Sequence, residues 1–188
     1  MRKLGLFLCI ITLFIGCGKA SDPGLKNTDG TTQIAVADTR DNDNPADEIG
    51  AKEGFSFEYG KTVIPMNVDA APIVKALGDP VEYFEAASCA FQGLDKQYYY
   101  QSFELGTYPQ GGRDFVSYVN FQDDTVSTAQ GIYLGSSLEE LLAAYGEDYT
   151  QEGTAYVYKK GESKLTFLVE EDTVVQITYG AIVEGLNN

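Results

Sequence analysis

Two stretches of the chain align without a gap: IPMNVDAAPIVKALGD at residues 64–79 and IYLGSSLEELLAAYGE at residues 132–147. In each, a short apolar segment precedes a polar residue, a run with apolar residues at helical spacing, and a glycine. Asp69 and Ser137 are residue types that accept hydrogen bonds from the first amides of a helix. Gly78 and Gly146 suit a helix C-terminus. The pattern predicts two short helices within an internal repeat.

After each expected helix the hydrophobic pattern changes from helical spacing to the alternation typical of strands. The strands expected after the first helix are residues 88–91, 98–108 and 115–121, and those after the second are 154–158, 165–169 and 173–179. Short turns between sequential strands favour antiparallel pairing. The predicted fold is therefore α+β, with two tandem repeats at about residues 60–125 and 128–182, each a helix plus a three-stranded antiparallel meander.

The first sixteen residues have the features of a lipoprotein signal peptide. Arg2 and Lys3 form a basic start, and an apolar run follows from residue 4 to residue 15. This run is too short to span a bilayer, which needs about 20 residues. The segment LFIGC at residues 13–17 resembles a lipobox, which predicts lipidation of Cys17; an ordinary cleaved signal is the alternative. Acylation of Cys17 would anchor the protein to the cell membrane, on its extracytoplasmic face.

Residues 17–54 are expected to form a lipidated cysteine and a disordered tether, because residues 18–54 hold no aromatic residue and few large apolar ones. Within this segment, residues 41–48 superficially resemble a calcium loop, but the glycine and the closing glutamate of that motif are missing. We therefore interpret them as linker. The folded domain is expected at residues 55–188, which contain 21 of the 23 phenylalanine and tyrosine residues.

The composition excludes several functions. The chain has no histidine, which removes catalytic constellations built on that residue, and its net charge of −15 disfavours nucleic-acid binding. Residues 55–188 carry 20 acidic and seven basic residues, a net charge of −13, so the acidity lies mainly in the folded domain. A partner should therefore be neutral, basic or bridged by cations.

Cys89 is the one cysteine of the predicted domain, because Cys9 lies in the signal and Cys17 is the expected anchor. Its small and apolar neighbours favour a buried hydrophobic role over a reactive thiol. No metal site or cofactor is predicted, although the acidic loops leave weak calcium binding open.

Several short motifs carry a family resemblance. They are LGDP at residues 77–80, AYGED at 144–148, SCAFQGLD at 88–95, TYP at 107–109 and GIYLG at 131–135. The first two resemble the tandem repeat of domains like the β-lactamase inhibitor protein (BLIP-like) and of the related small outer-membrane assembly lipoproteins. The other three more closely resemble lipoproteins of Gram-positive anaerobes. The resemblance implies a BLIP-like fold and, by analogy, enzyme inhibition. The inhibitor's disulfides have no counterpart here.

The tyrosines supply the candidate binding surface. If residues 98–108 form one strand, alternation places Tyr99 and Leu105 on the core side. The other side would then carry the candidate binding face, which is Tyr98, Tyr100, Glu104 and Tyr108, extended by Tyr118, Tyr156 and Tyr158 from neighbouring strands. Tyrosine offers a large contact area and one polar tip. The alternative is that these rings pack within the fold.

Paired acids occur at residues 123–124, 139–140, 147–148 and 170–172. A glycosidase needs two carboxylates that face each other across a cleft, whereas adjacent acids on turns or at a helix start fit solvation and the helix dipole. No catalytic residue is therefore predicted. The expected function is a non-catalytic binding module for a protein or cell-wall partner. The alternatives are inhibition of a secreted or envelope hydrolase and, last, an enzyme that uses carboxylates.

Overall fold

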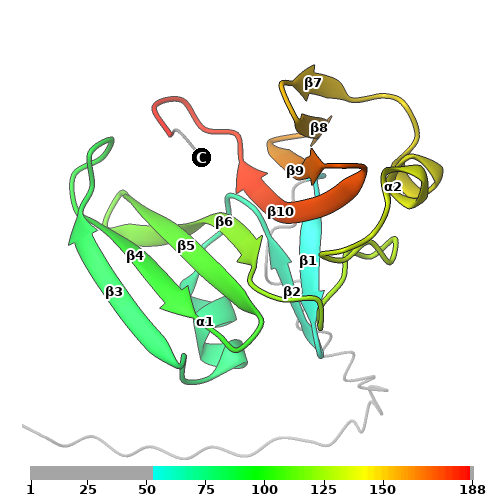
Figure 1. Cartoon of the computed structure of the whole chain (residues 1–188). Helices are drawn as coiled ribbons and strands as arrows, with labels where there is room; N and C mark the ends of the chain where they lie inside the picture. Colours follow the sequence, from blue (N-terminus) through cyan, green and yellow to red (C-terminus); the bar gives the residue numbers. More distant parts are fainter. Residues whose placement is uncertain (1–52, 187–188) are drawn as a thin grey trace, which may run out of the picture. The chain divides into compact units, whose positions relative to one another are not determined.

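Two β-sheets and two short helices make up residues 53–186, the part of the chain that this computed structural model describes (Figure 1). The predicted signal peptide, Cys17 and the segment at residues 41–48 lie outside these residues, as does the tether up to residue 52. In the described residues, no helix is long and apolar enough to cross a membrane.

The smaller sheet pairs β1 with β2, and the larger sheet contains eight strands. The strands are β1 (Ser56–Tyr59), β2 (Thr62–Pro65), β3 (Glu82–Ala87), β4 (Leu94–Tyr99), β5 (Phe103–Gln110), β6 (Arg113–Phe121), β7 (Thr150–Glu152), β8 (Ala155–Lys160), β9 (Ser163–Glu170) and β10 (Thr173–Ala181). The helices are α1 (Ala71–Leu77) and α2 (Leu138–Tyr145).

The larger sheet is antiparallel throughout, with the strand order β3-β4-β5-β6-β10-β9-β8-β7. Strands β3 to β6 form one meander and β7 to β10 form another. The two meanders join where β6 pairs with β10, through Tyr118 and Gly180, Val119 and Tyr179, and Asn120 and Thr178. One continuous sheet therefore contains strands that are about 60 residues apart in the chain.

The predicted fold of two repeats, each with a helix and three strands, is wrong. The described residues are mostly β-structure, with eight strands in a single sheet and helices of only seven and eight residues. The segment 88–91, predicted as a strand, is part of a turn in which the Ser88 hydroxyl accepts hydrogen bonds from the amides of Ala90 and Phe91. Local hydrogen bonds of this kind compete with strand formation.

The segment 98–108, predicted as one strand, is divided between β4 and β5. The amide of Tyr100 donates a 2.9 Å hydrogen bond to the carbonyl of Phe103, which closes a turn. This turn contains neither glycine nor proline, so the sequence carries no strong signal for it. Because the chain reverses direction at this turn, the alternation of side chains along β4 does not continue into β5. Residues of the two strands that were expected to share a face therefore lie on opposite faces.

The ends of the helices follow the sequence more closely. Ser137 is confirmed as the N-cap of α2, where its side chain and that of Glu140 form a capping box. For α1 the N-cap is Ala70 rather than Asp69, although the Asp69 carboxylate accepts a 3.0 Å hydrogen bond from the amide of Ala71. Gly78 and Gly146 are confirmed at the C-termini, each with positive φ.

The segments that lead into the helices lengthen the sheet beside the β6–β10 junction. The amide of Asn67 bonds to the carbonyl of Val116 on β6, and the amide of Val116 bonds back to the carbonyl of Val68, both at 2.9 Å. Before α2, Gly135 and Ser136 exchange 2.8 Å hydrogen bonds with Val174 on β10. The lead-in segments thus bond to β6 and β10 outside the three positions at which these two strands pair with each other.

The hydrophobic core lies on one face of the eight-stranded sheet. Phe57 and Ile64 from the small sheet, Ile73 from α1 and Leu141 from α2 belong to it and are at most 1% exposed. The sheet contributes fully buried residues from both meanders: Phe103, Leu105, Val116, Val119, Leu165, Phe167 and Ile177. The Phe57 ring lies 5.1 Å from that of Phe103 and 4.9 Å from that of Phe121. The small sheet and the helices therefore cover one face.

Candidate binding surface

The second face of the eight-stranded sheet carries the side chains that alternate with the core residues. We call this surface the open face and define it by ten residues: Gln97, Tyr99, Glu104, Gly106, Tyr118, Asn120, Lys164, Thr166, Gln176 and Thr178. Of these, Gly106 is buried, Gln176 is exposed and the other eight are half-buried. The open face crosses the β6–β10 junction and therefore belongs to both meanders.

Four tyrosines of the predicted binding face lie on the core side instead. Tyr98 is the cross-strand partner of buried Leu105, and Tyr100 stacks on Phe103 with ring centroids 4.9 Å apart. Tyr156 packs against the core and Tyr158 is 4% exposed. Burial raises the pKa of Tyr100 and of Tyr158 to about 12. The predicted face placed Tyr98 and Tyr100 beside Glu104 because it overlooked the turn between β4 and β5.

Tyr108 shares a side of β5 with Glu104, but its ring is only 1% exposed. The ring lies 5.1 Å from that of Phe91 and 5.8 Å from that of Phe115. Its hydroxyl donates a hydrogen bond to the side chain of Asn67. Tyr108 therefore joins strand β5 to the segment before α1 and offers no surface to a ligand.

Glu104 and Tyr118 are the two predicted residues that the open face contains. The Tyr118 hydroxyl donates a hydrogen bond to the Glu104 carboxylate and accepts one of 3.0 Å from Nε2 of Gln97. The pairing of Gly106 with Tyr118 lets the ring lie across the backbone of β5. A Cβ on Gly106 would overlap Cε1 and Cζ of that ring. Glycine is therefore required there for close approach rather than for its dihedral freedom.

The hydrogen-bond row continues to Tyr99, whose hydroxyl lies 3.3 Å from Oε1 of Gln97. Burial, together with the hydrogen bond to Glu104, holds the pKa of Tyr118 well above its ordinary value. The Glu104 carboxylate raises the pKa of Tyr99 as well. Both phenols are hydrogen-bond donors in this row, Tyr99 toward Gln97 and Tyr118 toward Glu104.

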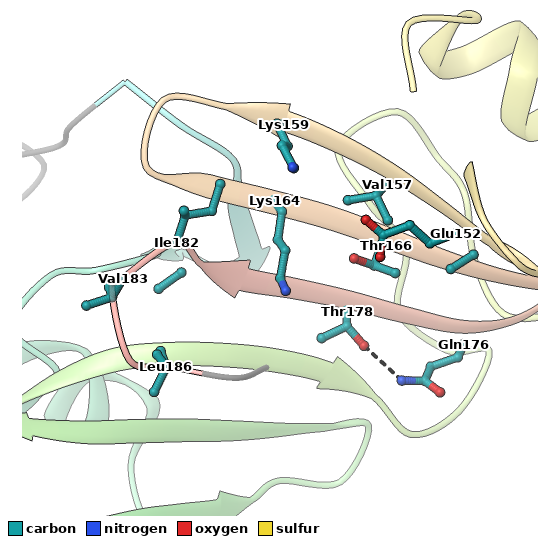
Figure 2. A pocket seen from close by; sticks show the side chains of 12 residues that line it. Glu152, Val157, Lys159, Lys164, Thr166, Gln176, Thr178, Ile182, Val183 and Leu186 are labelled. Atoms are coloured by element: carbon teal, nitrogen blue, oxygen red, sulfur yellow. Dashed lines mark hydrogen bonds between the residues drawn. The ribbon is translucent and has the colours of Figure 1, made fainter. Parts of the chain in front are cut away.

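A second polar row lies on β6 and β10. The Thr178 hydroxyl donates a 2.9 Å hydrogen bond to the side chain of Asn120. Nε2 of Gln176 donates a 3.1 Å bond to Thr178, drawn as a dashed line in Figure 2. The sequence pattern predicted neither this row nor Gln97. The expectation that Tyr99 lies on the core side is wrong, because Tyr99 pairs with Glu104 on the open face. Gly106 was a sequence signal for this surface, because an isolated glycine inside an alternating strand often marks the close approach of another group.

A groove of about 370 Å³ lies on the β7–β10 side of the open face (Figure 2). Val157, Lys159, Lys164 and Thr166 line it from β8 and β9, and Ile182, Val183 and Leu186 line it from the chain after β10. Leu186 also lines a smaller hollow of about 160 Å³ beside Tyr118. The C-terminal segment thus separates two hollows on the same surface.

The acid pairs do not form an opposed catalytic pair. Asp123 accepts hydrogen bonds from Thr125, which lower its pKa, and Glu140 is occupied in the capping box, which lowers its pKa too. The pairs at residues 147–148 and 170–172 are exposed. In the described residues no three or more acid or cysteine side chains gather as a group that could hold a metal ion. Cys89 is exposed, so the expectation of a buried role is wrong.

In comparisons with known proteins, no family model, curated protein or solved structure matches this chain.

The close approach of Tyr118 to Gly106 can be tested by a double-mutant cycle. Gly106→Ala should lower the free energy of unfolding by about 1–3 kcal/mol, because the new methyl group displaces the Tyr118 ring. In a Tyr118→Ala background the same substitution should cost much less, since the ring is gone. Urea unfolding of the four proteins measures the coupling. Equal costs in both backgrounds would contradict this packing.

Proposed function

We propose that the chain is a non-catalytic binding module whose recognition surface is the open face around Tyr118 and Glu104. The main support for this proposal is a row of hydrogen-bonded side chains on the face opposite the core, formed by Tyr99, Gln97, Tyr118 and Glu104. These groups are half-buried and fixed by one another, so little side-chain freedom remains to be lost on binding.

The chemistry of this surface suits a polar partner with some apolar area. Tyr118 and Tyr99 supply aromatic surface, while Glu104, Asn120 and Thr178 supply hydrogen-bonding groups. The nearby groove adds Ile182 and Leu186 as apolar lining and Lys164 as a cation. A protein or a cell-wall component of this mixed character fits the surface better than a nucleic acid, which the charge of −13 on residues 55–188 would repel.

Catalysis is not part of the proposal. The chain lacks histidine, and the acid pairs lie on turns or at the start of α2. Inhibition of a hydrolase would also be a binding function, but no particular contact in the described residues favours an enzyme over another partner.

We further propose that Cys17 carries a lipid anchor, which would place the module on the outer side of the cell membrane. The support comes from the segment LFIGC at residues 13–17 and from the polar residues that follow it. A surface anchored in this way would meet soluble and envelope partners at the membrane.

The anchor predicts a specific effect of Cys17→Ser. In the native host, this variant should move from the detergent phase to the aqueous phase in a detergent phase-separation assay and should lose incorporation of a labelled fatty acid. Cys9→Ser and Cys89→Ser serve as matched controls and should keep the wild-type behaviour. Fatty-acid labelling of the Cys17→Ser variant at the wild-type level would contradict the proposal.

The open-face proposal predicts selective loss of a partner after Tyr118→Ala. In crosslinking capture from envelope extracts of the host, wild-type protein should retain a partner that Tyr118→Ala and Glu104→Ala lose. Tyr133→Ala is the matched control, because Tyr133 is 42% exposed and lies outside the open face. Thermal unfolding should show that all variants remain folded. Identical capture by wild type and by the two open-face variants would contradict the proposal.

A further inference from the structure

Strand β3 forms one edge of the eight-stranded sheet, and all six of its residues are exposed. Figure 1 shows it at the end of the sheet, beside β4 alone. Two of its large apolar side chains are exposed, Tyr83 at 45% and Phe84 at 53%, and Val81, the residue before the strand, is 80% exposed. An exposed edge strand that carries aromatic rings is a ready template for the addition of another strand.

The opposite edge of the same sheet has a different character. Strand β7 contains only three residues, Thr150, Gln151 and Glu152, all polar and exposed. Short and polar edges discourage pairing with another chain. The sheet is therefore protected at β7 but presents a six-residue, aromatic edge at β3.

The backbone of β3 presents free ladder positions at this edge. The amide of Ser88 bonds to the carbonyl of Gly93, and the register pairs Tyr83 with Tyr98 and Glu85 with Lys96. In an antiparallel pair, residues that bond to the neighbour alternate with residues whose amide and carbonyl point away. Because Ser88 bonds to the neighbouring segment, every second residue before it along β3 also faces β4. The backbone amides and carbonyls of the residues between them, including Tyr83 and Glu85, point away from β4.

The side chains of β3 place aromatic rings and carboxylates on both faces of the edge. Glu82 and Phe84 lie on the same side as Gln97 and Tyr99, whereas Tyr83 and Glu85 lie on the core side. The Tyr83 ring lies 5.1 Å from that of Tyr98, and its hydroxyl donates a hydrogen bond to Glu85. Each face of the edge thus presents one aromatic ring and one carboxylate.

We propose that β3 binds an extended basic peptide segment by strand addition, with the pattern basic–apolar–apolar–basic. The two basic residues would face Glu82 and Glu85, and the two apolar residues between them would face Tyr83 and Phe84. The spacing follows from the sheet, because Glu82 and Glu85 are three positions apart and point to opposite faces. The pattern reads the same in both directions, so it fits a parallel or an antiparallel strand.

A second copy of the chain is a poor occupant of this edge. Strand β3 contains two glutamates and no basic residue, so pairing with itself would bring like charges together. Residues 55–188 also carry a net charge of −13, which repels another copy and attracts a basic segment. This inference concerns the edge of the sheet rather than the open face, so it does not depend on the proposed function.

The test is direct binding of a synthetic peptide, acetyl-Thr-Lys-Val-Val-Lys-Thr-amide, to the purified full chain by isothermal titration calorimetry. The peptide should bind saturably, and more weakly as salt is added. Acetyl-Thr-Glu-Val-Val-Glu-Thr-amide should bind at least about fivefold more weakly, because both charge pairs are lost. The Lys peptide with N-methyl groups on both valines should not bind, because it cannot complete the ladder.

Charge reversal at the edge makes the test specific. The double variant Glu82→Lys and Glu85→Lys should reverse the preference between the two peptides, whereas Glu152→Lys on the β7 edge is the matched control and should keep it. Both sites are exposed, and unfolding curves would verify that the variants fold. Absence of Lys-peptide binding, equal binding of its N-methylated form, or an unchanged preference after reversal would overturn the proposal. So would a wild-type dimer that dissociates after Glu82→Lys.

Discussion

The architecture depends on the short antiparallel contact between β6 and β10. Three residue pairs join a meander of β3 to β6 to a meander of β7 to β10, and Val119 and Tyr179 in this contact are at most 1% exposed. Because strands with buried side chains meet there, one core extends under both meanders. Tyr118 and Thr178 lie on the opposite side of the same contact, so the junction also creates the open face.

The surfaces of the sheet follow from this arrangement. The small sheet and the two helices contribute to the core on one face, and the other face keeps a row of mutually bonded polar groups with a groove beside it. The edges differ because β7 is short and polar whereas β3 is long and aromatic. The molecule thus offers two distinct places for a partner, one on the open face and one along β3.

The sequence predicted the parts of this fold that depend on local pattern. The capping box of Ser137 and Glu140, the helix-ending glycines and the alternating strands β6, β9 and β10 have local signals, because one face of each strand is buried. Strand β3 was missed because all six of its residues are exposed, so it lacks alternation between core and solvent.

The candidate site required information that is not local. Tyr98 was assigned to the face of Glu104 because the turn before Phe103 has no glycine or proline to mark it. Tyr118 and Glu104 meet through the register of β5 with β6, and the open face exists only because β6 pairs with β10. Such long-range pairings are fixed by packing of the whole chain rather than by any short motif.

Strands β6 and β10 unite the two meanders in one cooperative sheet. Native-state hydrogen exchange in increasing denaturant tests it most directly, through the slowest amides of β5 and β9, such as those of Leu105 and Phe167. In a cooperative sheet, the slowest amides of the two meanders should open with the same free energy and the same dependence on denaturant. Exchange of one meander at a distinctly lower free energy, while the other stays protected, would contradict it.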